Sequence, residues 1–199
     1  MTEIKIFNCW STEGIKVSDL GLANYINLQA SIIPKSSGRY RQQFHKSKMN
    51  IVERLITKLM VPGHHGKKHR ITSGRVVGKY LTNYNIVKKT FEKIEEMSKK
   101  NPIEVLVRAI ENTALIEEIA NYQIGGIIVR RAVITSPQRR VDISLRKITQ
   151  AAYRKSFGKR ETIVNALVNE IIGAYNNDKS KSDAIAERER IEKEAENAR

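Results

Sequence analysis

The side chains best suited to chemistry in this sequence are two pairs of arginines. Arg130 and Arg131 end an apolar run, and Arg139 and Arg140 follow within ten residues, just after a proline. A charge is seldom buried without a partner, so four guanidinium groups are a poor choice for building a core in so apolar a segment. The pattern therefore predicts that a partner outside the chain supplies negative charge, and that the chemistry is anion binding.

Positive charge is concentrated in two stretches of the 199 residues. The chain holds 36 Lys and Arg against 21 Asp and Glu, for a formal net charge of +15. Residues 34–93 have 15 basic and 2 acidic groups, net +13, and residues 128–160 have 10 and 1, net +9. Basic side chains that only make a surface soluble usually mix with acidic ones. The two stretches therefore predict a polyanionic partner, with nucleic acid ahead of an acidic membrane surface.

A two-stranded β-ribbon is predicted around the first arginine pair. β-Branched residues flank Gly125 and Gly126, which are typical of a two-residue hairpin turn. Such a turn pairs Ile124 with Ile127, Asn121 with Arg130, and Ala120 with Arg131. Successive side chains alternate between faces, so the two arginines point to opposite sides. A ribbon without a further strand is marginal in water, and this one is interpreted as a finger laid into a groove.

A helix with two distinct faces is predicted after the ribbon, from Arg139 to Phe157. Apolar residues recur at spacings of four and three residues, at Val141, Leu145, Ile148 and Ala152. Basic residues recur every seven residues, a spacing that keeps them on one side of a helix. This cationic ridge, with the arginine pair that opens it, consists of Arg139, Arg140, Arg146, Lys147, Arg154 and Lys155. We expect the ridge to face solvent in the free protein.

Other helices are predicted from apolar spacing and capping signals. One begins at Ile51 with Arg54 and Lys58 on its solvent side, and one covers 77–94, where tyrosines at core spacing favour packing over base stacking. Asn101 and Pro102 open a third, and residues 163–175 form a fourth. A short helix is expected between Ser18 and Ile32. The charged helix in residues 180–199 has too few large apolar residues to hold itself down by burial.

Metal binding and catalysis find little support in the residue types. The single cysteine, Cys9, cannot form an internal disulfide, and no Cys cluster is present for zinc. His65 and His69 lie in a glycine-containing loop without a nearby carboxylate or thiol. They are therefore interpreted as part of a positively charged loop rather than as metal ligands. No glycine-rich phosphate loop or nucleophile set occurs, and no apolar run approaches the ~18 residues of a membrane span. No enzyme, metal site or cofactor is expected.

Three stretches resemble a known family. "SSGRYRQQFHKSKMNIVERL", "NPIEVLVRAIEN" and "VRRAVITSPQRRV" are similar to the eukaryotic and archaeal branch of ribosomal protein family seven of the small subunit, and "EIKIFNCWST" resembles its eukaryotic amino-terminal extension. The resemblance implies a mainly α fold, a bundle of about six helices with a protruding two-stranded β-ribbon. It divides the chain into an extension and basic arm (1–49), a helical RNA-binding domain (50–178, with the ribbon at about 115–135) and a charged helical tail (179–199).

The resemblance also implies a function and partners. Similar proteins bind the head domain of small-subunit rRNA, help nucleate head assembly and lie near exit-site tRNA and the mRNA exit path. Neighbouring head and platform proteins are expected partners, and neither a membrane nor a homo-oligomer is. The expected location is the cytoplasmic ribosome, with nucleolar assembly in a eukaryotic source. Matching positions give the RNA contacts Arg39, Arg41, Lys46, Lys48, Lys67, Lys68, Arg130, Arg131, Arg139 and Arg140, extended by Arg146, Lys147, Arg154 and Lys155. Glu117 and Glu118 stand where similar proteins have a basic first strand.

A stand-alone helical RNA- or DNA-binding regulator is the alternative function. Such a protein needs a compact recognition helix and usually a dimer interface. Here the basic residues are spread over an arm, a loop, a ribbon and a helix, which favours a protein embedded in a larger RNA assembly.

Overall fold

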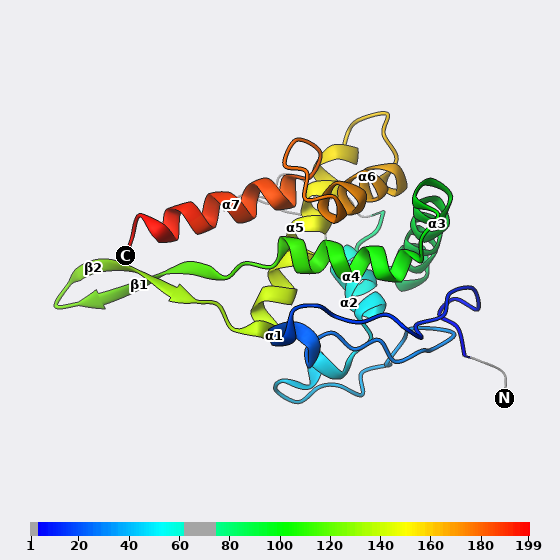
Figure 1. Ribbon diagram of the computed structural model, residues 1–199, viewed down its shortest axis with the longest axis horizontal. Helices are drawn as coiled ribbons and strands as arrows, with labels where there is room; N and C mark the ends of the chain where they lie inside the picture. Colours follow the sequence, from blue (N-terminus) through cyan, green and yellow to red (C-terminus); the bar gives the residue numbers. More distant parts are fainter. Residues whose placement is uncertain (1–3, 62–74) are drawn as a thin grey trace.

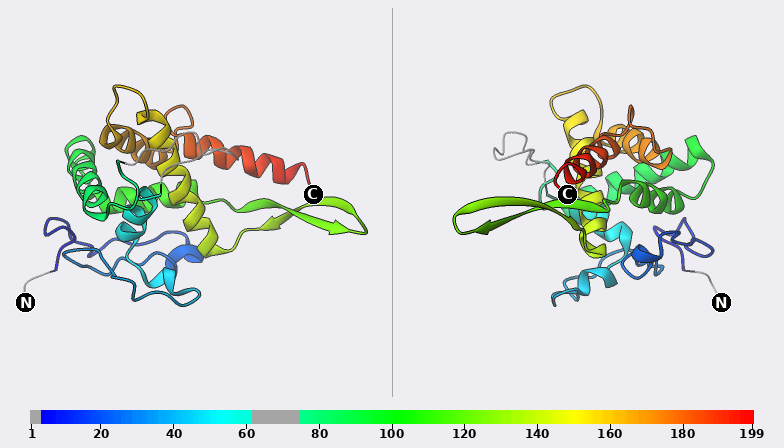
Figure 2. Two further views of the ribbon diagram at one scale, coloured as in Figure 1. Left: turned by 180° about the vertical axis from the view of Figure 1, so that it is seen from behind. Right: turned by 60° about the vertical axis from the view of Figure 1, so that its left-hand side comes forward.

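The computed structural model describes residues 4–61 and 75–199, which are mainly helical (Figure 1). The described elements are α1 (Leu20–Ala23), the 3-10 helix η1 (His45–Lys48), α2 (Ile51–Leu59), α3 (Tyr80–Ser98), α4 (Pro102–Thr113), β1 (Glu117–Ile124), β2 (Ile127–Ile134), α5 (Pro137–Ser156), α6 (Ile163–Tyr175) and α7 (Asp183–Glu196). The ribbon of β1 and β2 projects from the bundle with α7 alongside it, and Figure 2 shows the same arrangement from two other sides. The predicted fold class is confirmed.

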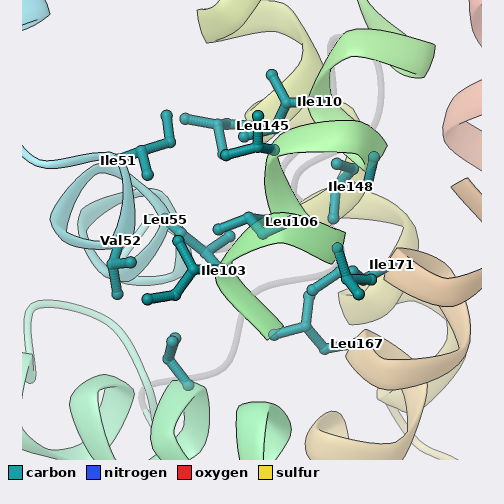
Figure 3. Packing of buried hydrophobic residues seen from close by; sticks show 14 of the residues in the cluster. Ile51, Val52, Leu55, Ile103, Leu106, Ile110, Leu145, Ile148, Leu167 and Ile171 are labelled. Carbon is teal, nitrogen blue, oxygen red and sulfur yellow. The ribbon is translucent and has the colours of Figure 1, made fainter. Parts of the chain in front are cut away.

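The core lies between α2, α4, α5 and α6 (Figure 3). Each of these helices turns the apolar stripe of its sequence toward the others, as helical periodicity predicts. The α5 stripe is confirmed in full, because its four members are all 0% exposed: Val141, Leu145, Ile148 and Ala152. Asn101 caps α4 by accepting a hydrogen bond from Ile103 N, with Pro102 at the first turn, as its sequence predicts.

Helix α2 buries a residue that was expected to face solvent. Arg54 is 1% exposed, and its guanidinium donates hydrogen bonds to the Tyr25 carbonyl at 2.8 Å and to Asp142 at 3.2 Å. The expectation that Arg54 and Lys58 share a solvent face was therefore wrong for Arg54. The reason is that the amino-terminal segment covers this side of a short helix and supplies a carbonyl as a partner. Lys58 stays partly exposed.

The tyrosines of α3 pack against the core, which confirms packing over base stacking for them. Tyr84 lies edge-on to Phe7, with ring centroids 4.7 Å apart, and Tyr80 donates a hydrogen bond to the Pro34 carbonyl. Burial raises the pKa of Tyr80, because the charged form would lose hydration. The helix begins at Tyr80, later than its spacing suggested, so Val77 is left 40% exposed.

The amino-terminal segment is a packed cover with little regular structure. The helix expected between Ser18 and Ile32 is reduced to the four residues of α1, capped by Asp19. Asn24 ends it, and Asn27 uses its amide group to bind the Lys48 carbonyl, so side-chain bonds compete with helix formation. Trp10 is 5% exposed and donates a hydrogen bond to Glu95 at 2.9 Å, which ties the segment to α3.

Helix α7 is docked on the bundle and on β1, which the sequence did not predict. Ala184, Ile185 and Ala195 are buried, and small alanine side chains let α7 approach its neighbours closely. Glu170 of α6 is 0% exposed and accepts hydrogen bonds from the Ser182 hydroxyl and Ala184 N. Burial of two alanines and Ile185, together with a carboxylate at the start of the helix, is enough to dock α7, so the expectation that too few apolar residues hold it down was wrong.

The core predicts what it costs to shorten a buried side chain of α5. We expect Leu145→Ala to lower the free energy of unfolding by about 2–5 kcal/mol, because the side chain is 0% exposed and its loss leaves a cavity. Leu81→Ala is the matched control, since Leu81 is 71% exposed and should change stability by no more than about 0.5 kcal/mol. Urea unfolding followed by circular dichroism measures both. Equal losses would contradict this core.

Candidate nucleic-acid interface

The ribbon has the predicted register. Ile124 pairs with Ile127, Asn121 with Arg130, and Ala120 with Arg131, so the two arginines lie on opposite faces. Gly125 and Gly126 form the turn with φ of 55° and 86°, a left-handed conformation that glycine adopts without strain. Arg130 and Arg131 are both exposed. The ribbon therefore presents a cation on each face, away from the bundle.

The root of the ribbon is held by its two acidic residues. Glu118 accepts two hydrogen bonds from the Arg139 guanidinium, one of them at 2.7 Å, and Glu117 forms an ion pair with Arg199. A paired arrangement of this kind fixes geometry as well as charge. Glu118 thus binds a side chain of α5, and Glu117 binds the side chain of the last residue, Arg199.

The cationic ridge of α5 is largely neutralised within the protein. Arg140 is only 14% exposed, donating to the Leu115 carbonyl at 2.7 Å and to Asp19 at 2.8 Å. The expectation that the arginine pair faces solvent was therefore wrong for Arg140, because the amino-terminal segment and the connection between α4 and β1 close over it. Arg139 is more exposed, at 57%, but it is paired with Glu118.

The later ridge residues connect α5 to α6 and α7. Lys147 lies 2.7 Å from Glu187, Arg154 pairs with Asp183, and Lys155 lies 2.7 Å from Glu170. Arg146 is exposed and forms no ion pair with the part of the chain that the structure describes. The ridge is thus an internal set of ion pairs with one cation left over.

The basic arm meets α5 at one carboxylate. Asp142 lies 2.7 Å from Lys46 and 3.2 Å from Arg54, so it joins η1, α2 and α5. Burial lowers the pKa of Lys58, and repulsion from Lys46, Arg146 and Arg54 adds to this effect against the attraction of Asp142. Lys46, Arg54, Lys58 and Arg146 are thus four positive charges gathered around one carboxylate.

The remaining arm residues are exposed. Arg39, Arg41 and Lys48 all face solvent. Lys67 and Lys68 lie outside the described residues, as does the loop of His65 and His69. The structure thus places Lys46 and Arg146 in the same cluster around Asp142. Arg130 and Arg131 lie apart from this cluster, on the projecting ribbon. Sequence reasoning missed Asp142 and Lys58, whose roles depend on contacts between distant segments.

Metal and membrane sites have no support in the described part of the chain. Within residues 4–61 and 75–199, no three His, Cys, Asp or Glu residues are grouped to hold an ion. None of the helices described there is long and apolar enough to cross a membrane.

Comparison with known proteins decides the family. Residues 22–199 match the family model described as ribosomal protein S7p/S5e. This chain belongs to that family. Small ribosomal subunit protein uS7 of Nanoarchaeum equitans is 46% identical over 198 residues, which cover 99% of this chain and 100% of the relative. The protein of the same name from Archaeoglobus fulgidus is 42% identical over 198 residues, covering 99% of this chain and 96% of its own length.

The family confirms the resemblance seen in the sequence. A third relative, from Methanothrix thermoacetophila, is 40% identical over 197 residues, 98% of this chain and 100% of its own. These relatives are archaeal and align with almost the whole chain. The nucleolar assembly that was expected for a eukaryotic source has no support. The chain is a ribosomal protein of the small subunit.

The geometry predicts different outcomes for the two members of the second arginine pair. Arg140→Ala should lower the free energy of unfolding by about 1.5–3 kcal/mol, because it leaves the Leu115 carbonyl and Asp19 without a charged donor. Arg139→Ala should cost no more than about 1 kcal/mol, since its ion pair is exposed. Urea unfolding of the two variants compares them directly. Similar costs would mean that Arg140 is no more internal than its neighbour.

A pH dependence follows from the ion pairs of Glu187 with Arg190 on the same helix and with Lys147 on α5. Hydrogen bonds from Arg190 and Lys147, acting against partial burial, lower the pKa of Glu187 from 4.5 to about 2. Because the folded pKa is the lower one, this stabilisation is fully present above pH 4.5 and lost as the pH falls through about 2. The difference in urea midpoint between wild type and Glu187→Gln should shrink over that range.

The exposed Glu196 provides the control for this titration, because it lies on the same helix. Glu196→Gln should follow the wild-type midpoint at every pH. A Glu187→Gln difference that stays constant down to pH 2 would contradict the assigned ion pairs.

Proposed function

We propose that this chain is a structural constituent of the small subunit that binds the head domain of its rRNA. The observation that carries the proposal is the cluster around Asp142, where Lys46 and Arg54 pair with the carboxylate and Lys58 lies close enough to be repelled by Lys46, Arg54 and Arg146. Four positive charges against one negative charge leave a surplus of three. The closely spaced phosphates of folded RNA are a partner that can compensate such a surplus.

The proposed RNA contacts form two groups, according to whether the basic side chain already pairs with a carboxylate of the chain. Direct phosphate contacts are proposed for Arg39, Arg41, Lys48, Arg130, Arg131 and Arg146, and on the resemblance alone for Lys67 and Lys68, which lie outside the described residues. The other predicted contacts already bind carboxylates of the chain, so they would meet RNA only through their remaining donors: Lys46, Arg139, Arg140, Lys147, Arg154 and Lys155. The interface is therefore centred on the arm, Arg146 and the ribbon.

A finer placement is also proposed. Resemblance to the family supports a role in nucleating head assembly, with exit-site tRNA and the mRNA exit path nearby and with head and platform proteins as neighbours. The projecting ribbon supports this placement, because an element that extends beyond the bundle can reach partners that the bundle does not touch (Figure 1). The proposed location is the cytoplasmic ribosome. The acidic carboxy-terminal helix is proposed to meet proteins rather than phosphates.

Salt dependence tests RNA binding. An in vitro transcript of the head domain should bind with a slope of log affinity against log salt of about −4 to −5, as expected for roughly six neutralised phosphates. Replacing Arg130 and Arg131 by Ala should weaken binding and make the slope shallower by about 2. Filter binding over a salt series measures both quantities.

A matched control uses two exposed cations of α3. Replacing Lys89 and Lys93 by Ala removes the same charge outside the proposed interface and should leave the slope unchanged. An affinity that is indifferent to salt, or a control that behaves like the ribbon variant, would contradict the proposed interface.

A further inference from the structure

A groove of about 380 Å³ lies where the amino-terminal segment meets the beginning of α5. Tyr25, Gln43 and Phe44 line it from the segment, and Pro137, Asp142 and Arg146 line it from α5. Its size falls within the range of pockets that hold small organic ligands. The groove adjoins the cluster around Asp142, because Asp142 and Arg146 belong to both.

Phe44 is an exposed aromatic residue held in an unusual conformation. Its side chain is 68% exposed, and its φ of 65° is in the left-handed region, which non-glycine residues rarely adopt. Local hydrogen bonds hold this conformation: the Ser47 hydroxyl donates to the Phe44 carbonyl at 2.9 Å, and His45 N donates to Gln42 at 3.2 Å. Strain of this kind tends to occur at binding sites, where surrounding contacts maintain it. The ring is thus kept at the groove instead of in the core.

The charges beside the groove complement the ring. Lys46 and Arg54 are engaged by Asp142, and Arg146 has no ion pair with the residues that the structure describes. A flat apolar surface next to an available guanidinium matches the two parts of a nucleotide, whose base has an apolar face and whose phosphate is an anion. An acidic peptide would satisfy the cations but would not require the aromatic ring.

We propose that this groove holds one unpaired nucleotide of RNA, with its base on the ring of Phe44 and its phosphate on Arg146. The inference rests on the proposed RNA binding and adds the kind of RNA element that is recognised. The nucleotide must be unpaired and unstacked, because bases inside a helix already stack on their neighbours and do not offer a face to a protein ring. Stacking of this kind tolerates any base, so the site recognises an unstacked base of any kind rather than a particular sequence.

A tryptophan at position 44 reports on the stacking directly. Phe44→Trp keeps an aromatic surface, and Trp10, the native tryptophan, is 5% exposed and far less accessible to a ligand. Titrating the variant with the head-domain transcript should quench its fluorescence over and above any change in wild type. The affinity of this variant should equal that of wild type within about twofold.

Two truncations separate the ring from the charge. Phe44→Ala should lower RNA affinity by about 5-fold to 100-fold with an unchanged salt slope, because stacking releases no counterions. Arg146→Ala should lower affinity and make the slope shallower by about 1. The double variant should lose less than the product of the two effects, since both side chains hold the same nucleotide.

Matched controls are available elsewhere on the surface. Leu81→Ala removes an apolar side chain that is 71% exposed, and Arg160→Ala removes an exposed guanidinium. Neither should change RNA affinity by more than about twofold. Thermal unfolding of Phe44→Ala should match wild type, because so exposed a ring contributes little to the core.

The outcomes distinguish this inference from the function on which it rests. RNA binding with normal affinity by Phe44→Ala, or with no quenching of Phe44→Trp, would overturn the nucleotide site and leave RNA binding intact. Wild type that fails to bind the transcript at any salt would overturn both. Equal quenching by polyglutamate would overturn the nucleotide in favour of an acidic protein segment.

Discussion

The carboxylate of Asp142 connects the arm, α2 and α5 through ion pairs that the hydrophobic core does not supply. It receives Lys46 from the arm and Arg54 from α2, and it belongs to α5. Arg54 is 1% exposed, and removing the partner of a buried charge costs about 3–5 kcal/mol. Asp142 therefore helps to fix the position of the arm on the bundle, and with it the groove beside Phe44.

Most other cations of α5 serve to assemble the protein. Arg140 holds the amino-terminal segment through Asp19, while Lys147 and Arg154 hold α7 through Glu187 and Asp183. Partly buried pairs of this kind gain from a lower local dielectric but need well-formed hydrogen bonds. A basic sequence thus does not translate directly into a basic surface, because internal acids neutralise part of it.

Sequence patterns predicted what depends on neighbours in the chain. Two glycines fixed the register of the ribbon, and periodicity identified the buried stripe around Leu145. The patterns failed where partners are distant: 88 residues separate Arg54 from Asp142, and 121 separate Arg140 from Asp19. A charge on a helix is assigned to solvent by default, and only the folded chain reveals a carboxylate opposite it.

The acidic residues of β1 resolve a question that the sequence left open. A two-stranded ribbon is marginal on its own, so its root must be held by the rest of the molecule. Glu118 binds Arg139 at the start of α5, and Glu117 binds Arg199 at the end of the chain. Basic residues at these positions would repel the two arginines that now anchor the root. Acids at the root and arginines beyond them therefore separate the two tasks of the ribbon, attachment to the protein and contact with an anionic partner.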